Sequence, residues 1–367
     1  MSASQSSSSA QAPPSDVEAS RAKISEAKAQ AFRHTLAKYD LNEDILQKIH
    51  DTFVEIAKDA GQIMKGAERK SLSSAAIKDN TTDLVTKYDK KIEEDARLRL
   101  HNVFPAIEFL GEETFGAGTV LSDKPTVVLD PIDGTLNFTR GVRYCAVSIA
   151  LVLEKKPIIG VVYSPFEGEL FTAIRGKGSH RTKMNDEGSV IEKVQLPLPE
   201  HYGRPMPNLK GCLLGFEWGH KREGPNWDLR TQVLIWLLAA NGAMCKSIRT
   251  RGSCALDFCN VALGEFDAYW DCDAKVWDVA AGWCIVEEAG GIVASVNPGD
   301  WQPTMEGRVY FPIRKAEPEE QKAVVGEFWA HMGERRFQYG ATGTLKDPEE
   351  QPKERKTWFS YFRASIW

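Results

Sequence analysis

The sequence DPIDGTLNF at residues 130–138 follows directly on TVVL at residues 126–129, an apolar and β-branched run that is typical of a buried strand. It places Asp130 at the carboxyl end of that strand and predicts Asp133 as the N-cap of a following helix. Gly134 would let the backbone N–H groups at the start of this helix approach a negatively charged oxygen. The stretch therefore predicts a strand, a turn and a helix that hold two carboxylates beside a phosphate.

Two further stretches place carboxylates next to predicted apolar elements. Glu112 lies in GEE at residues 111–113, directly after a predicted strand, and Asp278 lies in WDVAAG at residues 277–282, at the start of a predicted buried helix. Read alone, Glu112 is more typical of a solvated turn, Asp278 of a helix N-cap, and the Asp-Gly pair of the first stretch of a tight turn. The combination of all three stretches in one chain favours a shared site.

The fold would put four negative charges in one cleft if it brings Glu112, Asp130, Asp133 and Asp278 together. At about 4 Å and an effective dielectric constant of about 20, each close pair repels by about 4 kcal/mol, so the cluster must bind protons or cations. Its ligands are all oxygens, with the carbonyl of Ile132 as a further candidate, and this favours Mg²⁺ or Mn²⁺ over zinc. The pattern indicates phosphate chemistry with two metal ions, of which one activates water and another stabilises the leaving oxygen.

The composition of the whole chain limits the class of protein. The 367 residues are 42% apolar and 26% charged, and 46 Lys and Arg against 51 Asp and Glu give a net charge of −5, too balanced to indicate a nucleic-acid or membrane surface. No apolar run reaches the ~18 residues of a membrane span, and the N-terminus lacks the apolar segment of a secretory signal. Seven cysteines without a C-x-x-C pair predict reduced, buried thiols in a cytoplasmic protein.

The hydrophobic pattern divides the chain into three parts and predicts an α/β protein. Residues 1–16 predict a disordered Ser-rich tail, residues 17–314 a catalytic domain of two α/β lobes with a boundary near 195–211, and residues 315–367 a charged C-terminal extension. The expected helices lie at residues 16–39, 42–67, 82–100, 228–240, 279–289 and 317–332, and the expected strands at residues 107–110, 126–129, 146–153, 157–162 and 170–174.

These motifs resemble those of the inositol monophosphatase family, which are Mg²⁺-dependent, lithium-sensitive phosphatases, and a fungal-type member in particular. The resemblance rests on GEE, DPIDGTLNF and WDVAAGWCIVEEAGG in the family's order. It extends through DLVTKYDKKIE at 83–93, AVSIALV at 146–152, GVVYSPFEGELFTA at 160–173 and GEFDAYWD at 264–271. It covers roughly residues 42–311 and implies a layered α-β-α-β-α sandwich with the metal ions between two lobes.

The resemblance also implies the metal ligands. Glu112, Asp130 and the carbonyl oxygen of Ile132 would hold a first Mg²⁺. Asp130, Asp133 and Asp278 would hold a second, and Glu112 would help to hold a third. Two or three Mg²⁺ ions are therefore the expected cofactors.

The catalytic and phosphate-binding residues are implied in the same way. Gly134 and Thr135 would bind the phosphate through their backbone amides, beside Asp133. Thr135 would pair with Asp89 to activate the attacking water, and Glu112 would take part in catalysis as well as in metal binding. Without the resemblance, Asp89 is better explained as a surface charge on its predicted helix.

Two positions depart from the family's usual pattern, and both concern the substrate. Inositol-specific members have a Glu seven residues before the aspartate of WD, where this chain has Asp271, one methylene shorter and expected to accept a hydrogen bond from a ring hydroxyl. The family's G-T-A-A stretch reads GSCA at residues 252–255, where Cys254 is more typical of a pocket wall than of a nucleophile because no His lies near it in sequence.

The expected activity is hydrolysis of inositol monophosphate, but other substrates and one other role stay open. The substrate could be a sugar phosphate, histidinol phosphate or phosphoadenosine phosphate, or the protein could be a regulatory relative of the quinate-pathway type that has kept the fold. The complete set of carboxylates favours an enzyme, and LNF at residues 136–138 resembles the inositol branch. The expected partners are a small phosphate ester and a second copy of the chain in a homodimer, with no nucleic acid and no membrane.

Overall fold

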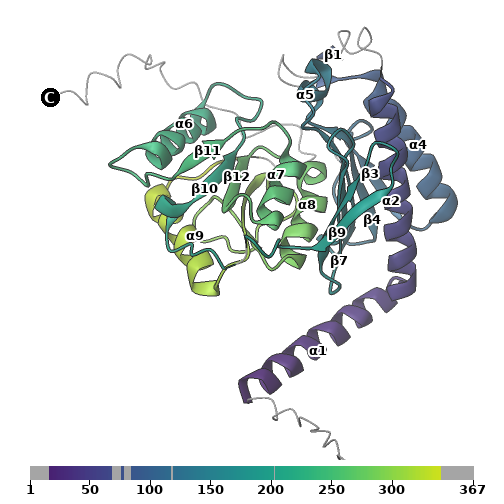
Figure 1. Ribbon diagram of the computed structural model, residues 1–367, viewed down its shortest axis with the longest axis horizontal. Helices are drawn as coiled ribbons and strands as arrows, with labels where there is room; N and C mark the ends of the chain where they lie inside the picture. Colours follow the sequence, from purple (N-terminus) through teal and green to yellow (C-terminus); the bar gives the residue numbers. More distant parts are fainter. Residues whose placement is uncertain (1–15, 68–75, 78–83, 117–118, 202, 340–367) are drawn as a thin grey trace, which may run out of the picture. The chain divides into compact units, whose positions relative to one another are not determined.

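The computed structural model describes residues 16–67, 76–77, 84–116, 119–201 and 203–339 (Figure 1). The chain divides into two units, Met1–Lys48 and Ile49–Trp367, which are described separately. The first contains α1 (Asp16–Ala37) and the start of α2 (Glu43–Lys65), and both helices were predicted from the sequence. Apart from Asp16, the tail predicted to be disordered lies outside the described residues.

The second unit is built around two β-sheets (Figure 1). The larger has the order β3-β4-β5-β6-β7-β8-β9 and is antiparallel except for the β3–β4 pair. The smaller has the order β11-β10-β12-β14-β13, with β10 parallel to both of its neighbours. The strands of the larger sheet are β3 (Glu108–Gly111), β4 (Thr126–Asp133), β5 (Ala146–Leu153), β6 (Lys156–Ser164), β7 (Glu169–Ile174), β8 (Ser179–Met184) and β9 (Val190–Gln195). Those of the smaller are β10 (Leu213–Phe216), β11 (Ser247–Arg249), β12 (Ala268–Cys272), β13 (Ile292–Ala294) and β14 (Val309–Ile313).

Helices cover both faces of each sheet in this unit (Figure 1). The central helices α7 (Cys254–Leu263) and α8 (Val276–Glu288) lie between the two sheets and contact both. The remaining part of α2 and α4 (Lys87–Val103) lie against the larger sheet, and α6 (Pro225–Leu238) and α9 (Pro318–Met332) against the smaller. This arrangement confirms the α/β fold and the layered α-β-α-β-α sandwich that the motifs implied. The smaller elements are β1 (Ala76–Ile77), β2 (Leu84–Val85), α5 (Thr135–Arg140) and the 3₁₀ turn η1 (Leu209–Gly211).

Small residues allow the central helices to fill the space between the sheets. A Cβ on Gly160 of β6 would lie 2.3 Å from the carbonyl oxygen of Ala281 in α8. A Cβ on Gly282 of α8 would lie 2.4 Å from the Cβ of Phe258 in α7. Since real atoms do not approach so closely, these glycines allow the middle of α8 to pack closely against both β6 and α7.

Two predictions about element boundaries are wrong. The helix predicted over residues 82–100 begins at Lys87, because Thr86 serves as its N-cap and Leu84–Val85 forms β2, while residues 82–83 lie outside the described part. The second concerns α9, which belongs to the folded body rather than to an extension starting at residue 315, because its apolar face is buried in the core of the smaller sheet. The buried residues of that face are Val324, Val325, Phe328 and Met332.

Two further expectations concern the cysteines and the membrane. All seven cysteines are buried and free of disulfide bonds, as their spacing predicts. Within the described ranges, no helix combines the length and the apolar character that crossing a bilayer requires.

Candidate active site

The structure brings together three of the four predicted carboxylates as a compact cluster. Asp130 and Asp133 come from β4 and Asp278 from the first turn of α8, and each offers an oxygen within 4.8 Å of the others. Glu112 follows β3 and lines the same pocket. The Ile132 carbonyl belongs to the same stretch of β4, and its residue also lines the pocket.

A β-bulge explains how both carboxylates of β4 reach one site. In a regular strand, residues three apart face opposite sides of the sheet. Here Asp130 pairs with Ser148 and Asp133 with Ala146, so the register shifts between the two pairs. The extra residue turns Asp133 to the side of Asp130, and Pro131, which has no N–H to donate, lies within the bulge.

Asp133 does not cap the helix that follows it, contrary to the prediction. Gly134 is the N-cap of α5, with φ of 88°, and a Cβ there would lie 2.8 Å from the carbonyl oxygen of Gly252. The Asp133 carboxylate instead accepts hydrogen bonds from the Ser253 hydroxyl and, at 2.9 Å, from the Ala255 backbone N–H. It therefore binds the N-terminus of α7, which joins the larger sheet to the central helices.

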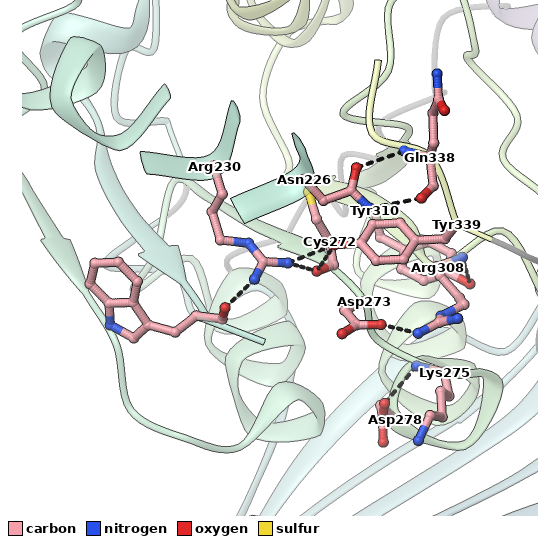
Figure 2. A network of polar contacts seen from close by, with 11 residues as sticks. Asn226, Arg230, Cys272, Asp273, Lys275, Asp278, Arg308, Tyr310, Gln338 and Tyr339 are labelled. Carbon is pink, nitrogen blue, oxygen red and sulfur yellow. Dashed lines mark hydrogen bonds and ion pairs between the residues drawn. The ribbon is translucent and has the colours of Figure 1, made fainter. Parts of the chain in front are cut away.

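Asp278 is also not an N-cap but the third residue of α8. Lys275 is the N-cap, and its backbone N–H donates to the Asp278 carboxylate at 2.6 Å (Figure 2). This bond holds one carboxylate oxygen toward the start of the helix.

Glu93 of α4 positions the turn that carries Glu112. Its buried carboxylate accepts hydrogen bonds from the backbone N–H groups of Glu113 at 2.8 Å and Thr114 at 2.7 Å. A Cβ at position 111 would lie 2.3 Å from the Glu93 carboxyl carbon, so a larger residue in place of Gly111 would displace this carboxylate from its present position. Glu93 lies in the matched stretch at residues 83–93, but its residue type and spacing indicated no role for it.

The carboxylates of the cluster are costly to ionise on their own, so they tend to bind protons or to share a cation. Burial raises the pKa of Asp278 to about 7, with the nearby Glu112 carboxylate adding to the shift. Burial also raises the pKa of Asp133 well above its usual range, and Asp278 is the charge that adds most. Carboxylates that are expensive to ionise alone become favourable once a divalent cation shares them, so this all-oxygen donor set fits Mg²⁺.

We expect Mg²⁺ to stabilise the fold more at pH 8 than at pH 5. The pKa of Asp278 is about 7 in the folded protein and about 3.9 in the unfolded chain. Between these two pH values the metal-free folded protein binds more protons than the unfolded chain, so its stability falls as the pH rises. Mg²⁺ requires ionised ligands and so competes with these protons. The check is the rise in unfolding temperature from chelator to MgCl₂, measured at pH 5 and at pH 8. An equal rise at both pH values would contradict competition between Mg²⁺ and protons for these carboxylates.

Thr135 and Asp89 lie next to each other, although they are 46 residues apart in sequence. The Thr135 hydroxyl is 3.4 Å from one Asp89 oxygen and 3.0 Å from the Ile132 carbonyl oxygen. The other Asp89 oxygen accepts from the backbone N–H and hydroxyl of Thr86, at 2.9 and 2.5 Å. Asp89 is buried rather than a surface charge, and burial raises its pKa to about 6.

The cluster lies at one side of a pocket of about 290 Å³. Its other wall comes from the smaller sheet and includes Glu217, Trp218, His220, Arg222 and Asp271. A larger cavity of about 480 Å³, near the ends of α2 and α5, has no carboxylate in its lining. The pocket at the cluster is therefore the candidate active site.

Glu217 is a pocket residue that the sequence analysis missed. Its carboxylate accepts hydrogen bonds from the backbone N–H groups of Arg251 at 2.8 Å and Gly252 at 2.6 Å, and so holds the loop that leads into α7. It directly follows β10, just as Glu112 follows β3. A carboxylate directly after an apolar strand was the signal that could have found it.

Asp271 and Cys254 both line the pocket. Asp271 is buried in β12, where the Tyr269 hydroxyl donates to one of its oxygens at 2.6 Å and burial raises its pKa to about 7. Burial raises the pKa of the Cys254 thiol well above its usual range, so the thiol stays protonated and is a poor nucleophile.

Fold and site together define the class of protein, which is a five-layer α/β sandwich with a cluster of carboxylates that could hold a cation beside a polar pocket. A family model described as the inositol monophosphatase family matches residues 45–332, and the chain belongs to this family. It is 37% identical over 298 residues to inositol monophosphatase 2 of Saccharomyces cerevisiae, covering 80% of this chain and 97% of that protein.

Two further comparisons widen the set of similar proteins. Quinic acid degradation cluster protein x of Neurospora crassa is 32% identical, over 78% of this chain and 94% of that protein. Among solved structures, the extragenic suppressor protein suhB of Bartonella henselae matches with a TM-score of 0.61 and 26% identity, over 77% of this chain and 98% of that chain.

Proposed function

We propose that the protein is a Mg²⁺-dependent phosphomonoesterase that hydrolyses an inositol monophosphate to inositol and phosphate. The observation that carries the proposal is the placement of oxygens from the buried Asp130 and Asp133 and the half-buried Asp278 within 4.8 Å of one another, in the pocket that Gly134 and Thr135 also line. The name and high coverage of the yeast relative support inositol monophosphate as the substrate.

The metal ligands in this proposal are those that the motifs implied. Glu112, Asp130 and the Ile132 carbonyl would hold one Mg²⁺, and Asp130, Asp133 and Asp278 another, with Glu112 contributing to a third. When bound, Mg²⁺ supplies positive charge that lowers the pKa of water and stabilises the leaving oxygen. The bulge in β4 and the turn held by Glu93 pre-organise the carboxylates for this task.

The phosphate would bind at the start of α5. Among the described residues, no hydrogen bond occupies the backbone N–H of Gly134 or of Thr135. These two donors lie beside the carboxylate cluster, where a phosphate oxygen could accept from them.

Thr135 and Asp89 would orient the attacking water. The Thr135 hydroxyl has one proton, which it donates either to the Ile132 carbonyl or to Asp89. If the Ile132 oxygen served as a metal ligand, the hydroxyl would donate to Asp89, and its oxygen would be free to accept a hydrogen bond from the attacking water and so orient it.

The experiment that tests the substrate is a phosphate-release screen of purified protein with Mg²⁺. The panel is inositol 1-phosphate, a sugar phosphate, histidinol phosphate and phosphoadenosine phosphate. We expect the highest kcat/KM on inositol 1-phosphate. The main rival is a substrate with a second anionic group, because Arg222 and His220 line the wall opposite the cluster, and a preference for phosphoadenosine phosphate would establish it.

We expect Li⁺ to inhibit hydrolysis at millimolar concentrations. Li⁺ is similar to Mg²⁺ in size but carries half its charge, so it can occupy a Mg²⁺ site without supplying the same stabilisation. The check is a rate measurement over a LiCl series, with KCl at equal ionic strength as the control. Unchanged rates in tens of millimolar LiCl would contradict the proposed metal site.

A further inference from the structure

Two buried ion pairs lie at opposite ends of the antiparallel β12–β14 pair, and their comparison singles out Asp273. At one end, Asp267 precedes β12 and pairs with Arg314, which follows β14, at 2.7 Å. At the other end, Asp273 follows β12 and pairs with Arg308, which precedes β14 (Figure 2). All four side chains are largely buried.

The two aspartates differ in how their oxygens are used. One Asp267 oxygen accepts from Arg314 and the other from the Leu213 backbone N–H at 2.7 Å, so both have partners. Arg308 donates to one Asp273 oxygen, and within the described part of the chain no hydrogen bond reaches the other. Asp273 also lines the active-site pocket, which Asp267 does not. Its second oxygen is therefore an acceptor available to a bound ligand.

The backbone at Asp273 adopts a conformation that side chains disfavour. Its φ is 126° and that of Arg308 is 60°. The Asp273 N–H donates to the Arg308 carbonyl oxygen at 2.7 Å, so the backbone and side chains of the two residues are both paired. Such strain persists where surrounding contacts impose it, and it concentrates at functional sites.

Residues 338–339, which follow the family match, supply part of these contacts (Figure 2). The guanidinium of Arg308 lies 4.9 Å from the centre of the Tyr339 ring. The Tyr339 hydroxyl accepts from the buried Arg230 at 2.9 Å and donates to the Cys272 carbonyl at 3.0 Å, directly before Asp273.

The same segment is anchored to α6. Asn226 and Gln338 exchange two hydrogen bonds, at 2.7 and 2.9 Å. Arg230 of this helix also donates to the Cys272 and Trp218 carbonyls, and so links the end of β12, between pocket residues Asp271 and Asp273, to the pocket segment that follows β10.

We propose that Asp273 is a second substrate-recognition carboxylate beside Asp271, and that Arg308 and Tyr339 are its positioning residues. The inference rests on the proposed function and deepens it. A carboxylate accepts hydrogen bonds from hydroxyl groups and repels a second phosphate, so two of them on one wall select the monophosphate of a polyhydroxylated ring.

The test compares Asp273→Asn with Asp267→Asn, the matched change at the other end of the same strand pair. The readout is the ratio of kcat/KM for inositol 1-phosphate to kcat/KM for 4-nitrophenyl phosphate, which has no ring hydroxyls. Loss of a charged hydrogen bond is expected to lower this ratio about ten- to a hundredfold in Asp273→Asn. Asp267→Asn is expected to lower the unfolding temperature but to leave the ratio unchanged. An unchanged ratio in Asp273→Asn, or an equal fall in both variants, would overturn the inference.

Tyr339→Phe provides a milder test that does not depend on whether Asp273→Asn folds. It keeps the aromatic ring next to Arg308 and removes only the hydroxyl. The ratio of kcat/KM for the two esters is therefore expected to fall by a smaller factor than in Asp273→Asn. An unchanged ratio would refute the positioning role of Tyr339. A wild-type protein that releases phosphate from neither ester overturns the proposed function and the inference together. An active wild type with an unaltered ratio in the variants overturns the inference alone.

Discussion

Asp278→Asn is expected to lower kcat for phosphate release by at least about a thousandfold while the protein stays folded. The asparagine oxygen can still accept the Lys275 N–H, so the first turn of α8 is preserved. What is lost is one negative ligand from a cluster whose oxygens lie within 4.8 Å of one another. The measurement is steady-state hydrolysis of inositol 1-phosphate with saturating Mg²⁺, together with the unfolding temperature.

Glu288→Gln is the matched control for this variant. Glu288 is the last residue of α8 and also accepts a backbone hydrogen bond, from Gly178 at 2.8 Å, but it does not line the pocket. Its amide variant should keep kcat within about twofold of wild type, as is usual for a change outside the site. Near-wild-type turnover in Asp278→Asn would rule out the proposed metal site.

Thr135→Ala is expected to lower kcat by about a hundredfold with little change in KM. The hydroxyl would orient water through Asp89, and this interaction acts mainly in the transition state, whereas the backbone N–H that would bind phosphate is retained. The measurement is kcat and KM on inositol 1-phosphate.

Thr135→Ser separates the hydroxyl from the rest of the side chain. It keeps the oxygen that lies 3.0 Å from the Ile132 carbonyl and 3.4 Å from Asp89, so most of the activity should return. If Thr135→Ala instead raises KM tenfold and leaves kcat unchanged, Thr135 is a phosphate-binding group and does not orient water.

The sequence carries local signals that predict the fold well. Short apolar runs bounded by turn residues predicted five strands of the larger sheet, because these patterns depend on neighbours in the chain. The charged composition after residue 315 concealed α9 as a core helix, although Val324, Val325, Phe328 and Met332 have helical spacing. For α9, the spacing of apolar residues predicted burial better than the average composition of the segment did.

The sequence predicted which residues make up the candidate site, but not which partners these residues contact. Asp133 has the sequence features of an N-cap, yet its partners Ser253 and Ala255 lie 120 and 122 residues further along the chain. Glu93 and Glu217 act through backbone N–H groups of distant loops, and residue identity does not show which N–H groups these carboxylates reach. The bulge in β4 is compatible with Pro131, but its exact position depends on the register with β5.

The most direct test of the proposed metal-dependent phosphatase activity is phosphate release from inositol 1-phosphate by protein freed of metal with a chelator. The clustered carboxylates of Asp130, Asp133 and Asp278 are expected to support no turnover alone. We expect release to be undetectable in the chelator and to be restored by adding Mg²⁺ in excess. Equal rates of release with chelator and with Mg²⁺ would contradict the account.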